Sequence, residues 1–565
     1  MAAAEVAGEL ARLEAIRWTF GAAAALERRE RLQRLLRSRT LSAPQLERLH
    51  ELLLAARAYP DDARTLALVA RALRGFGARA DVRRQRAAFA DTGIAGCDIV
   101  FPFFAPTARR LAAGWPRKLE IDWASYEQAP QAALEAWLPL LAHEGEVPGL
   151  DEVDYGLRGW LARMKAPDEA DGAFVARSLS ARMHGDDALF ERVHDGLEPA
   201  YRLRGDATTP SRTRDQWPVR TAHFQREPFA GRPDLARAAA TPPRSVRALS
   251  EREGERALAL AASCMVTRSR DLDVFAWGDA RDVRHVDCGD GLAFLMIGAR
   301  PERRLLLESV YGFLTLKNGL PIGYVLTSAL YRSAELAFNV FDTFRGAEAG
   351  PVYGKVIGMT RALFGTDTFT IFPYQLGEGN DEAIESGAWW FYQKMGFRPR
   401  ARAARALMAR ELALMRRRAG HRSSAAVLKR LAAHNLYWSL RSGHRDVIGE
   451  LPLPSAGVAV TRLIARRFAG DRARAAEVCE REAAARLGVR SVAGWSAGER
   501  HAWRRWAPLV TLLPGVARWS SAERAALCDV IRAKGGPRED TFVHAFDAHP
   551  KLGPALAKLL RSVRA

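Results

Sequence analysis

One stretch near the middle of the 565-residue chain combines residue types that could hold an anion. Residues 335–341 have the pattern of a β-strand, and a loop of small residues, 345–350, leads from it into a helical pattern over about 352–364. A loop that enters a helix N-terminus presents free backbone N–H groups and the positive end of the helix dipole. The sequence therefore predicts an anion site here, with a pyrophosphate as the expected ligand.

A second stretch carries a tyrosine that could donate a proton. It reads Ala388, Trp389, Trp390, Phe391, Tyr392, Gln393, Lys394, Met395, Gly396, Phe397. A phenol with its ordinary pKa near 10 stays protonated at neutral pH and can reprotonate a thiolate. The structural alternative is that Tyr392 belongs to one apolar face of a helix over 381–395 and only packs on a sheet.

Together the two stretches resemble the GNAT superfamily of N-acetyltransferases. The first is similar to the family's motif A, a strand ending in Val followed by an aromatic-Arg-Gly segment and a pyrophosphate-binding loop. The second is similar to the family signature Ala-x-x-x-Tyr-x-Lys-x-Gly-Phe. The residues that fit motif A are Val340, Phe344, Arg345, Gly346 and Gly350, and Glu348 stands where the family usually has Gly.

The resemblance implies direct transfer of an acyl group from acetyl-CoA, or another acyl-CoA, to an amine on a small molecule or a protein. Tyr392 would protonate the departing thiolate, the strand near Phe338 would hold the pantetheine, and the loop would hold the pyrophosphate. The implied cofactor-binding residues are Phe338, Val340, Phe341, Arg345, Gly346, Ala347, Glu348, Ala349, Gly350 and Asn380.

Glu335, at the start of the predicted strand, is the candidate general base, and its alternative is an exposed charge at a strand end. Asp342 and Glu348 are weaker candidates. The histidines are scattered and none pairs with a Cys or Ser in a nucleophile motif, so we expect no covalent intermediate. We also expect no metal, since the five cysteines lie far apart without ligand spacing.

Two other functions use the same fold. The donor could be an aminoacyl-tRNA, as in proteins similar to the aminoacyl-transferring peptidoglycan enzymes, which usually have two such domains, whereas this chain has the motif pair once. Alternatively, a degenerate transferase fold could serve as a binding or scaffold module.

The surrounding elements predict a mixed α/β sheet in the centre, flanked by mostly helical N- and C-terminal regions. We expect a helical region over 1–200, a Pro- and Arg-rich linker over 201–249 without helix or central strand, the transferase-like domain over 250–400, and a basic helical region over 401–565.

Within the central domain, Ser250 and Glu253 form a capping box that predicts a helix to about residue 265. Strands are expected over 292–297 and 368–374, and Asn318 with Gly319 predicts a tight hairpin between 310–316 and 321–329. The family sheet needs one more strand, for which residues 435–440 are the candidate after a basic helix over 400–418.

The net charge of +20 makes a nucleic-acid partner possible. We do not favour it, because only nine of the 85 basic residues are Lys and the rest are Arg, in an Ala-rich chain whose composition indicates codon bias. Their spacing is typical of solvated helix faces. Since the N-terminus lacks the pattern of a signal peptide and the apolar runs are too short to span a membrane, we expect a cytoplasmic protein with reduced cysteines.

Overall fold

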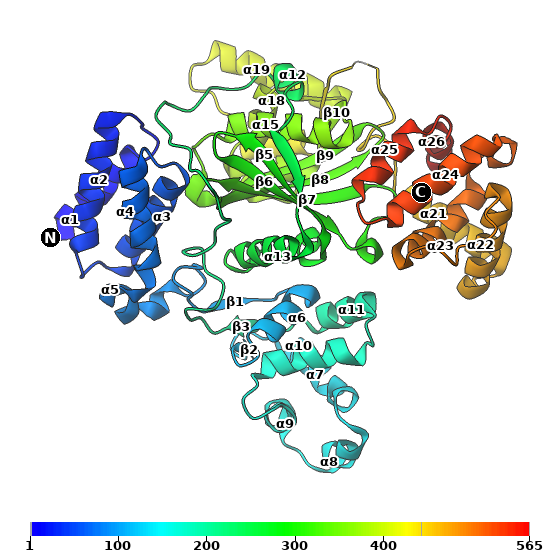
Figure 1. Cartoon of the computed structure of the whole chain (residues 1–565), viewed down its shortest axis with the longest axis horizontal. Helices are drawn as coiled ribbons and strands as arrows, with labels where there is room; N and C mark the ends of the chain where they lie inside the picture. The colour runs from blue at the N-terminus through cyan, green and yellow to red at the C-terminus, as the bar shows by residue number, and fades with distance from the viewer. Residues whose placement is uncertain (1–2, 442, 564–565) are drawn as a thin grey trace. The chain divides into compact units, whose positions relative to one another are not determined.

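The computed structural model describes residues 3–441 and 443–563, which fall into two units (Figure 1). Unit 1 comprises Met1–Pro228, Glu255–Trp277 and Lys317–Pro321. Unit 2 comprises Phe229–Gly254, Gly278–Leu316 and Ile322–Ala565. Since unit 2 contains the two motif stretches, its architecture determines where the predicted site residues lie.

Unit 2 is built on a mixed sheet whose strands follow the order β11-β12-β10-β9-β8-β7-β6-β5-β4 (Figure 1). The strands are β4 (Ser245–Ala248), β5 (Gly278–Gly289), β6 (Leu292–Ala299), β7 (Ser309–Lys317), β8 (Leu320–Leu330), β9 (Ser333–Val340), β10 (Thr368–Ile371), β11 (Arg398–Pro399) and β12 (Leu436–Ser439). β9 pairs antiparallel with β8 and parallel with β10, and β12 lies between β10 and β11. The apolar faces of these strands form the core of unit 2.

Helices flank this sheet. They are α12 (Leu235–Ala239), α15 (Ala349–Phe364), α16 (Pro373–Leu376), α17 (Asp381–Glu385), α18 (Ala388–Lys394), α19 (Arg402–Arg417), α20 (Ala425–Ala432), α21 (Ser455–Phe468), α22 (Arg472–Leu487), α23 (Ala497–Leu512), α24 (Ser521–Gly535), α25 (Asp540–Ala548) and α26 (Leu552–Ser562). α15 ends at Gly365, whose positive φ of 68° lets the chain turn directly into β10. Phe338 of β9 contacts Tyr353 of α15, which in turn contacts Tyr392 of α18, so both helices pack on the same face of the sheet.

Most of the local predictions are confirmed. Asn318 and Gly319 both have positive φ, 49° and 77°, at the tip of the β7–β8 hairpin. The Ser250 and Glu253 box caps α13 (Glu251–Val266), through hydrogen bonds of 2.9 and 3.4 Å. The strand expected over 435–440 exists as β12, and the basic helix before it as α19.

The prediction that residues 201–249 contain no helix and no central strand is wrong. β3 (Tyr201–Leu203) is the middle strand of a small sheet, α12 packs on α15, and β4 is the edge strand of the large sheet. Pro and Gly here lie between these short elements, so composition alone hid them. The helix expected over 381–395 is also wrong in detail, since Gly387, at a φ of 69°, separates α17 from α18.

Unit 1 is mostly helical. Its helices are α1 (Ala3–Ala15), α2 (Ala22–Arg37), α3 (Ala43–Ala58), α4 (Ala63–Arg74), α5 (Ala80–Arg84), α6 (Ala105–Gly114), α7 (Gln128–Leu141), α8 (Val147–Glu152), α9 (Gly156–Met164), α10 (Asp171–Arg182), α11 (Asp187–Leu197), α14 (Asp273–Ala276) and most of α13. They accompany a three-stranded antiparallel sheet in the order β1-β3-β2, with β1 (Ile99–Phe101) and β2 (Leu119–Ile121) on either side of β3 (Figure 1). One apolar core cluster, around Leu134, Phe174 and Phe190, is formed by residues between 99 and 203.

Candidate functional site

The parallel strands β9 and β10 pair over only three residues, because β10 ends one residue after the last pair. Their last paired residues are Glu335 and Thr370. β9 continues to Val340 while remaining paired with β8, whereas β10 ends at Ile371. The β10-side edge of β9 beyond Glu335 therefore has no strand partner among those described.

Tyr392 reaches this edge of β9. Its side chain is 3% exposed and lies among the rings of Tyr353, Phe391 and Phe397, with centroid distances of 5.5, 5.2 and 5.9 Å. Burial raises the pKa of Tyr392 above its ordinary value, and a hydrogen bond from the Phe338 backbone opposes that shift. The hydroxyl is therefore held protonated against the strand edge, while the ring packs in an aromatic cluster. Both the structural and the chemical interpretation of Tyr392 are compatible with this position.

Glu335 is the last residue of β9 that pairs with β10. Its side chain is partly buried, and burial together with the Glu308 carboxylate raises the pKa of Glu335 to about 7. A carboxyl group with this pKa can act as a general base near neutral pH. With its ordinary pKa, the same group would be a much weaker base. Glu335 and Phe338 are an odd number of residues apart, so their side chains leave β9 on opposite faces. Glu335 is thus separated from Tyr392 by the strand itself.

The loop after β9 forms the predicted approach to α15. Phe341 continues the sheet through its N–H bond to the Ile322 carbonyl at 2.9 Å, and a single 3-10 turn, η5 (Asp342–Phe344), follows. Gly346 has a φ of 83°, and Glu348 is the N-cap residue of α15. The first helical amides belong to Ala349 and Gly350, and Pro351 contributes none.

The charges around this loop oppose an anion. The Arg345 guanidinium is already paired with Asp342, at 2.9 Å, and with Glu382. Glu348 places a third carboxylate at the start of α15, where a phosphate would bind. Arg232 and Pro233 lie over the first turn, since a Cβ on Gly350 would be 3.6 Å from the Pro233 Cδ. As folded, the loop does not fit the pyrophosphate of coenzyme A.

Asn380 also has a role other than ligand binding. Its Oδ1 accepts a hydrogen bond from the Ala383 N–H at 3.1 Å and so caps α17, while its Nδ2 donates to the Tyr374 carbonyl at 3.1 Å. Of the predicted site residues, the structure brings Phe338 and Tyr392 together, and places Glu335 at the end of the same gap. Val340 and Phe341 continue β9, and Arg345, Gly346, Ala347, Glu348, Ala349 and Gly350 form the loop beyond it.

Sequence reasoning missed two contributors to this region. Glu308 lies just before β7, and its effect on Glu335 depends on a sheet neighbour two strands away. The segment around Pro233 packs on α15, because Cβ atoms on Gly354 and Gly358 would contact Pro233 and the Thr241 carbonyl. No local sequence pattern signals either contact.

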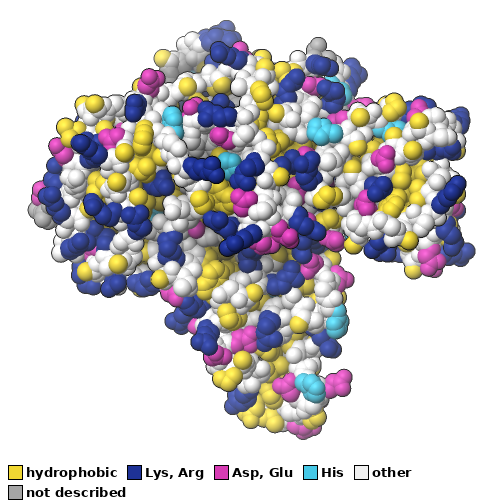
Figure 2. Space-filling model, viewed as in Figure 1, with side chains coloured by type: hydrophobic (Ala, Val, Ile, Leu, Met, Phe, Trp, Pro, Cys, Tyr) yellow, Lys and Arg dark blue, Asp and Glu magenta, His cyan; other side chains and the backbone are white. Residues whose placement is uncertain are grey.

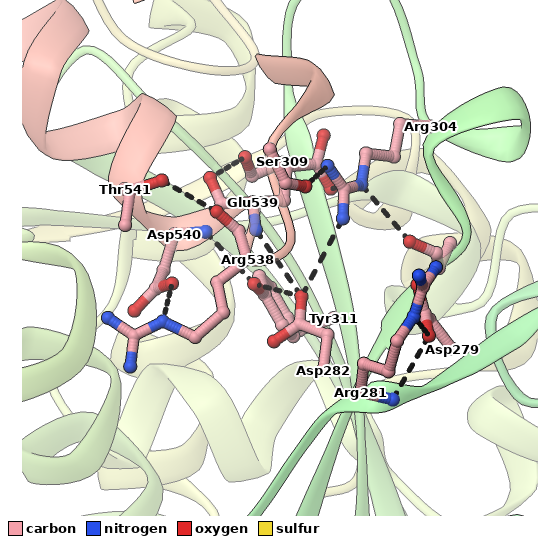
Figure 3. A network of polar contacts seen from close by, with 12 residues as sticks. Asp279, Arg281, Asp282, Arg304, Ser309, Tyr311, Arg538, Glu539, Asp540 and Thr541 are labelled. Carbon is pink, nitrogen blue, oxygen red and sulfur yellow. Dashed lines mark hydrogen bonds and ion pairs between the residues drawn. The ribbon is translucent and has the colours of Figure 1, made fainter. Parts of the chain in front are cut away.

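A second cluster of ionisable groups lies elsewhere in unit 2 (Figure 3). The Tyr311 hydroxyl donates to Asp282 Oδ2 at 2.7 Å and accepts from the Asp540 N–H at 2.9 Å. Arg284 pairs with Asp540 at 2.6 Å. Ser309 donates to the Glu539 carbonyl at 3.1 Å, and Glu539 pairs with Lys534 at 2.5 Å.

We interpret this cluster as a structural one that holds parts of unit 2 together. The side chains of Asp282, Arg284 and Asp540 are at most 8% exposed, and the cavity beside Arg304 and Lys534 has no space for a water-sized molecule. Burial raises the pKa of Asp282 to about 6, although Arg284 and the Tyr311 hydroxyl oppose that shift. The paired charges join β5 and β7 to the start of α25.

On the face drawn in Figure 2, Lys and Arg side chains are spread among Asp, Glu and uncharged residues. Among the described residues, no group of three or more His, Cys, Asp and Glu side chains could hold a metal ion. Within that same part of the chain, every helix is too short or too polar to cross a membrane.

Comparison with known proteins gives no independent identification. No family model matches the chain, and neither the curated proteins nor the solved structures include a match. The assignment of a function therefore depends on the gap between β9 and β10 and the side chains around it.

Proposed function

We propose that unit 2 is an N-acyltransferase that binds an acyl thioester, such as an acyl-CoA, in the gap beside β9. The observation that carries the proposal is the end of the β9–β10 pairing directly after Glu335, with the Tyr392 hydroxyl held against the Phe338 backbone. The strand order β11-β12-β10-β9 also supports the proposal. β12 lies between β10 and β11, so β9 and β10 remain adjacent and parallel. The GNAT resemblance of the two motif stretches points to the same reaction.

In this reaction a neutral amine would attack the thioester carbonyl. The new C–N bond forms as the C–S bond breaks, and no metal is required. Glu335, with a pKa of about 7 and on the face of β9 opposite to Tyr392, would take the proton that the amine loses, so the amine would have to reach the thioester from that face. Tyr392 would give its proton to the departing thiolate, and its raised pKa keeps that proton in place until then.

The donor's extended arm would bind to the open edge of β9. Main-chain groups between Leu336 and Val340 other than the one that Tyr392 engages would form hydrogen bonds with amides of a pantetheine arm, as an added strand would. The loop at Arg345 contributes little, since its guanidinium is engaged by Asp342 and Glu382. The thioester arm, rather than the diphosphate, should therefore supply most of the donor's binding free energy.

Calorimetry with two donors tests this division. Acetyl-CoA and S-acetylpantetheine share the thioester arm, but only acetyl-CoA carries the diphosphate. We expect both to bind the full chain with dissociation constants within about tenfold of each other. An Arg345→Ala variant should leave S-acetylpantetheine binding unchanged.

Two other results would contradict this binding mode or the proposed function. If acetyl-CoA binds at least about a hundredfold more tightly than S-acetylpantetheine, the loop recognises the diphosphate after rearranging. If neither compound binds at millimolar concentration, the transferase proposal fails. Salt-dependent binding of RNA or DNA in that case would support the binding-module alternative.

A further inference from the structure

A pocket of about 660 Å³ lies within unit 1, at one end of the small sheet. Phe101 of β1 and Ile121 of β2 both pair with Tyr201 of β3. The last residues of β1 and β2 and the first residue of β3 therefore lie at the same end of the sheet. The loops that leave this end form the pocket walls. Its volume is in the range of pockets that hold small organic ligands.

Hydrogen bonds fix the walls of this pocket. Tyr126 donates to the Leu197 carbonyl at 2.8 Å, which ties the loop after β2 to the end of α11. His194 is 1% exposed and lies 2.9 Å from the Tyr201 hydroxyl and 3.4 Å from the Asp195 carboxylate. Glu198 has a φ of 41°, which turns the chain sharply from α11 toward β3. The pocket is thus preformed by buried contacts.

The lining combines aromatic rings with negative charge. Phe101, Phe103, Phe104 and Tyr126 supply its apolar surface. Its charged side chains are Glu127, Asp195 and Glu198, and the lining contains no Lys or Arg although the chain carries a net charge of +20. The nearest arginine on β3, Arg202, is paired with Asp122 at 2.6 Å and does not line the pocket.

We propose that this pocket binds a small organic amine in its protonated form, with the ammonium group near Glu127 and Glu198 and the apolar body against Phe101, Phe103 and Phe104. Carboxylates attract the ammonium group directly, and the faces of aromatic rings attract cations through their quadrupole. An anionic ligand would meet three carboxylates without a compensating charge. The site is independent of the transferase activity proposed for unit 2.

A charge series of similar ligands tests the proposal on the full chain. Phenethylammonium, 2-phenylethanol and 3-phenylpropionate share a phenyl ring on a short chain but differ in charge. By calorimetry at pH 7 we expect phenethylammonium to bind at least about tenfold more tightly than the alcohol, and the carboxylate to give no measurable binding. Added salt should weaken phenethylammonium binding but not alcohol binding.

Variants then locate the binding. Glu127 and Glu198 are exposed, so E127Q/E198Q should fold normally and bind phenethylammonium about tenfold more weakly. Glu30→Gln, an exposed change elsewhere in unit 1, is the matched control and should have no effect. Phe104→Ala should weaken binding of the ammonium and the alcohol alike.

Three results would overturn the proposal. They are equal affinities for the ammonium and the alcohol, unchanged phenethylammonium affinity in E127Q/E198Q, and no detectable phenethylammonium binding at about 10 mM.

Discussion

The rings of Tyr353 and Tyr392 lie edge to face, with their centroids 5.5 Å apart and an interplanar angle of 69°. Both side chains are buried, but their hydroxyl groups differ. The Tyr392 hydroxyl interacts with the Phe338 backbone at the open edge of β9, whereas the Tyr353 hydroxyl has no hydrogen-bond partner among the residues that the structure describes. The pair therefore offers a matched comparison between a hydroxyl placed to act and one that only occupies the core.

Replacing Tyr392 by Phe should lower the turnover number about a hundredfold, because the leaving thiolate loses its proton donor. Donor affinity should change little, since the ring and its packing remain. Tyr353→Phe removes only an unpaired buried hydroxyl, so it should leave turnover unchanged and stability equal or higher. Thiol release followed at saturating donor measures both variants, and equal turnover in both would remove Tyr392 from the mechanism.

The pKa of about 7 for Glu335 predicts a pH profile. A general base acts in its deprotonated form, so turnover should rise as pH increases through about 7 and then level off. Glu335→Gln should lower turnover about a hundredfold or more and remove this rising limb. Steady-state rates between pH 5.5 and 9 test both expectations.

The control for Glu335 is Glu477→Gln, an exposed change on α22. It should preserve both the rate and the profile. A Glu335→Gln variant that keeps the rising limb would show that another group titrates, and Glu335 would then be a structural carboxyl.

The features predicted well from sequence are those decided by neighbours in the chain. The Asn318 and Gly319 turn depends on the conformations available to those two residues, and it forms as expected. What surrounds the turn could not be predicted. Within unit 1 the Asn318 side chain donates to the Ala58 carbonyl at 2.8 Å, and a Cβ on Gly319 would lie 2.2 Å from the Trp217 carbonyl oxygen. Long-range contacts thus bury a hairpin tip that local rules leave exposed.

β5 is an element that the sequence did not predict, because its charged residues depend on distant partners. Its sequence carries Asp279, Arg281, Asp282 and Arg284, a charged pattern that is unusual for a buried strand, and it was not predicted. Asp282 and Arg284 each have one strong partner, since the Tyr311 hydroxyl donates to Asp282 and Arg284 donates to Asp540, and Asp540 lies more than two hundred residues further along the chain. In the candidate site, too, local motifs could be predicted and distant contacts could not. Tyr392 could be identified from its motif, whereas the carboxylates that neutralise Arg345 include Glu382 of a different helix.

Breaking the buried cluster should destabilise unit 2 strongly. Arg284→Met removes the cation 2.6 Å from the buried Asp540 carboxylate and leaves it only the half-exposed Arg538 at 3.7 Å, which should lower the free energy of unfolding by about 3–5 kcal/mol. The double variant R284M/D540L removes both charges and should recover much of that loss. Arg467→Ala breaks the exposed pair with Glu482 and should lower the free energy of unfolding far less than Arg284→Met does. Urea unfolding measures all three, and a loss for Arg284→Met no larger than for Arg467→Ala would contradict a cohesive role.

Asp215 should make the stability of unit 1 depend on pH. This partly buried carboxyl accepts a hydrogen bond from the Ser263 hydroxyl at 2.7 Å, and burial raises its pKa to about 6, from an ordinary value of about 3.9. Since the folded state holds the proton more tightly than the unfolded chain, the stabilising contribution is complete below about pH 4. It is lost as pH rises to about 6, and the shift corresponds to about 3 kcal/mol.

Asp215→Asn removes this titration, so the free energy of unfolding should vary less between pH 4 and 7 than in the parent chain, by about 3 kcal/mol. Ser263→Ala removes a hydrogen bond that favours the charged carboxylate, so it should move the pH-dependent loss to higher pH. Urea unfolding monitored by hydrogen-exchange mass spectrometry separates unit 1 from unit 2. An unchanged pH dependence in Asp215→Asn would mean that other carboxyl groups carry it, because a substituted side chain cannot titrate.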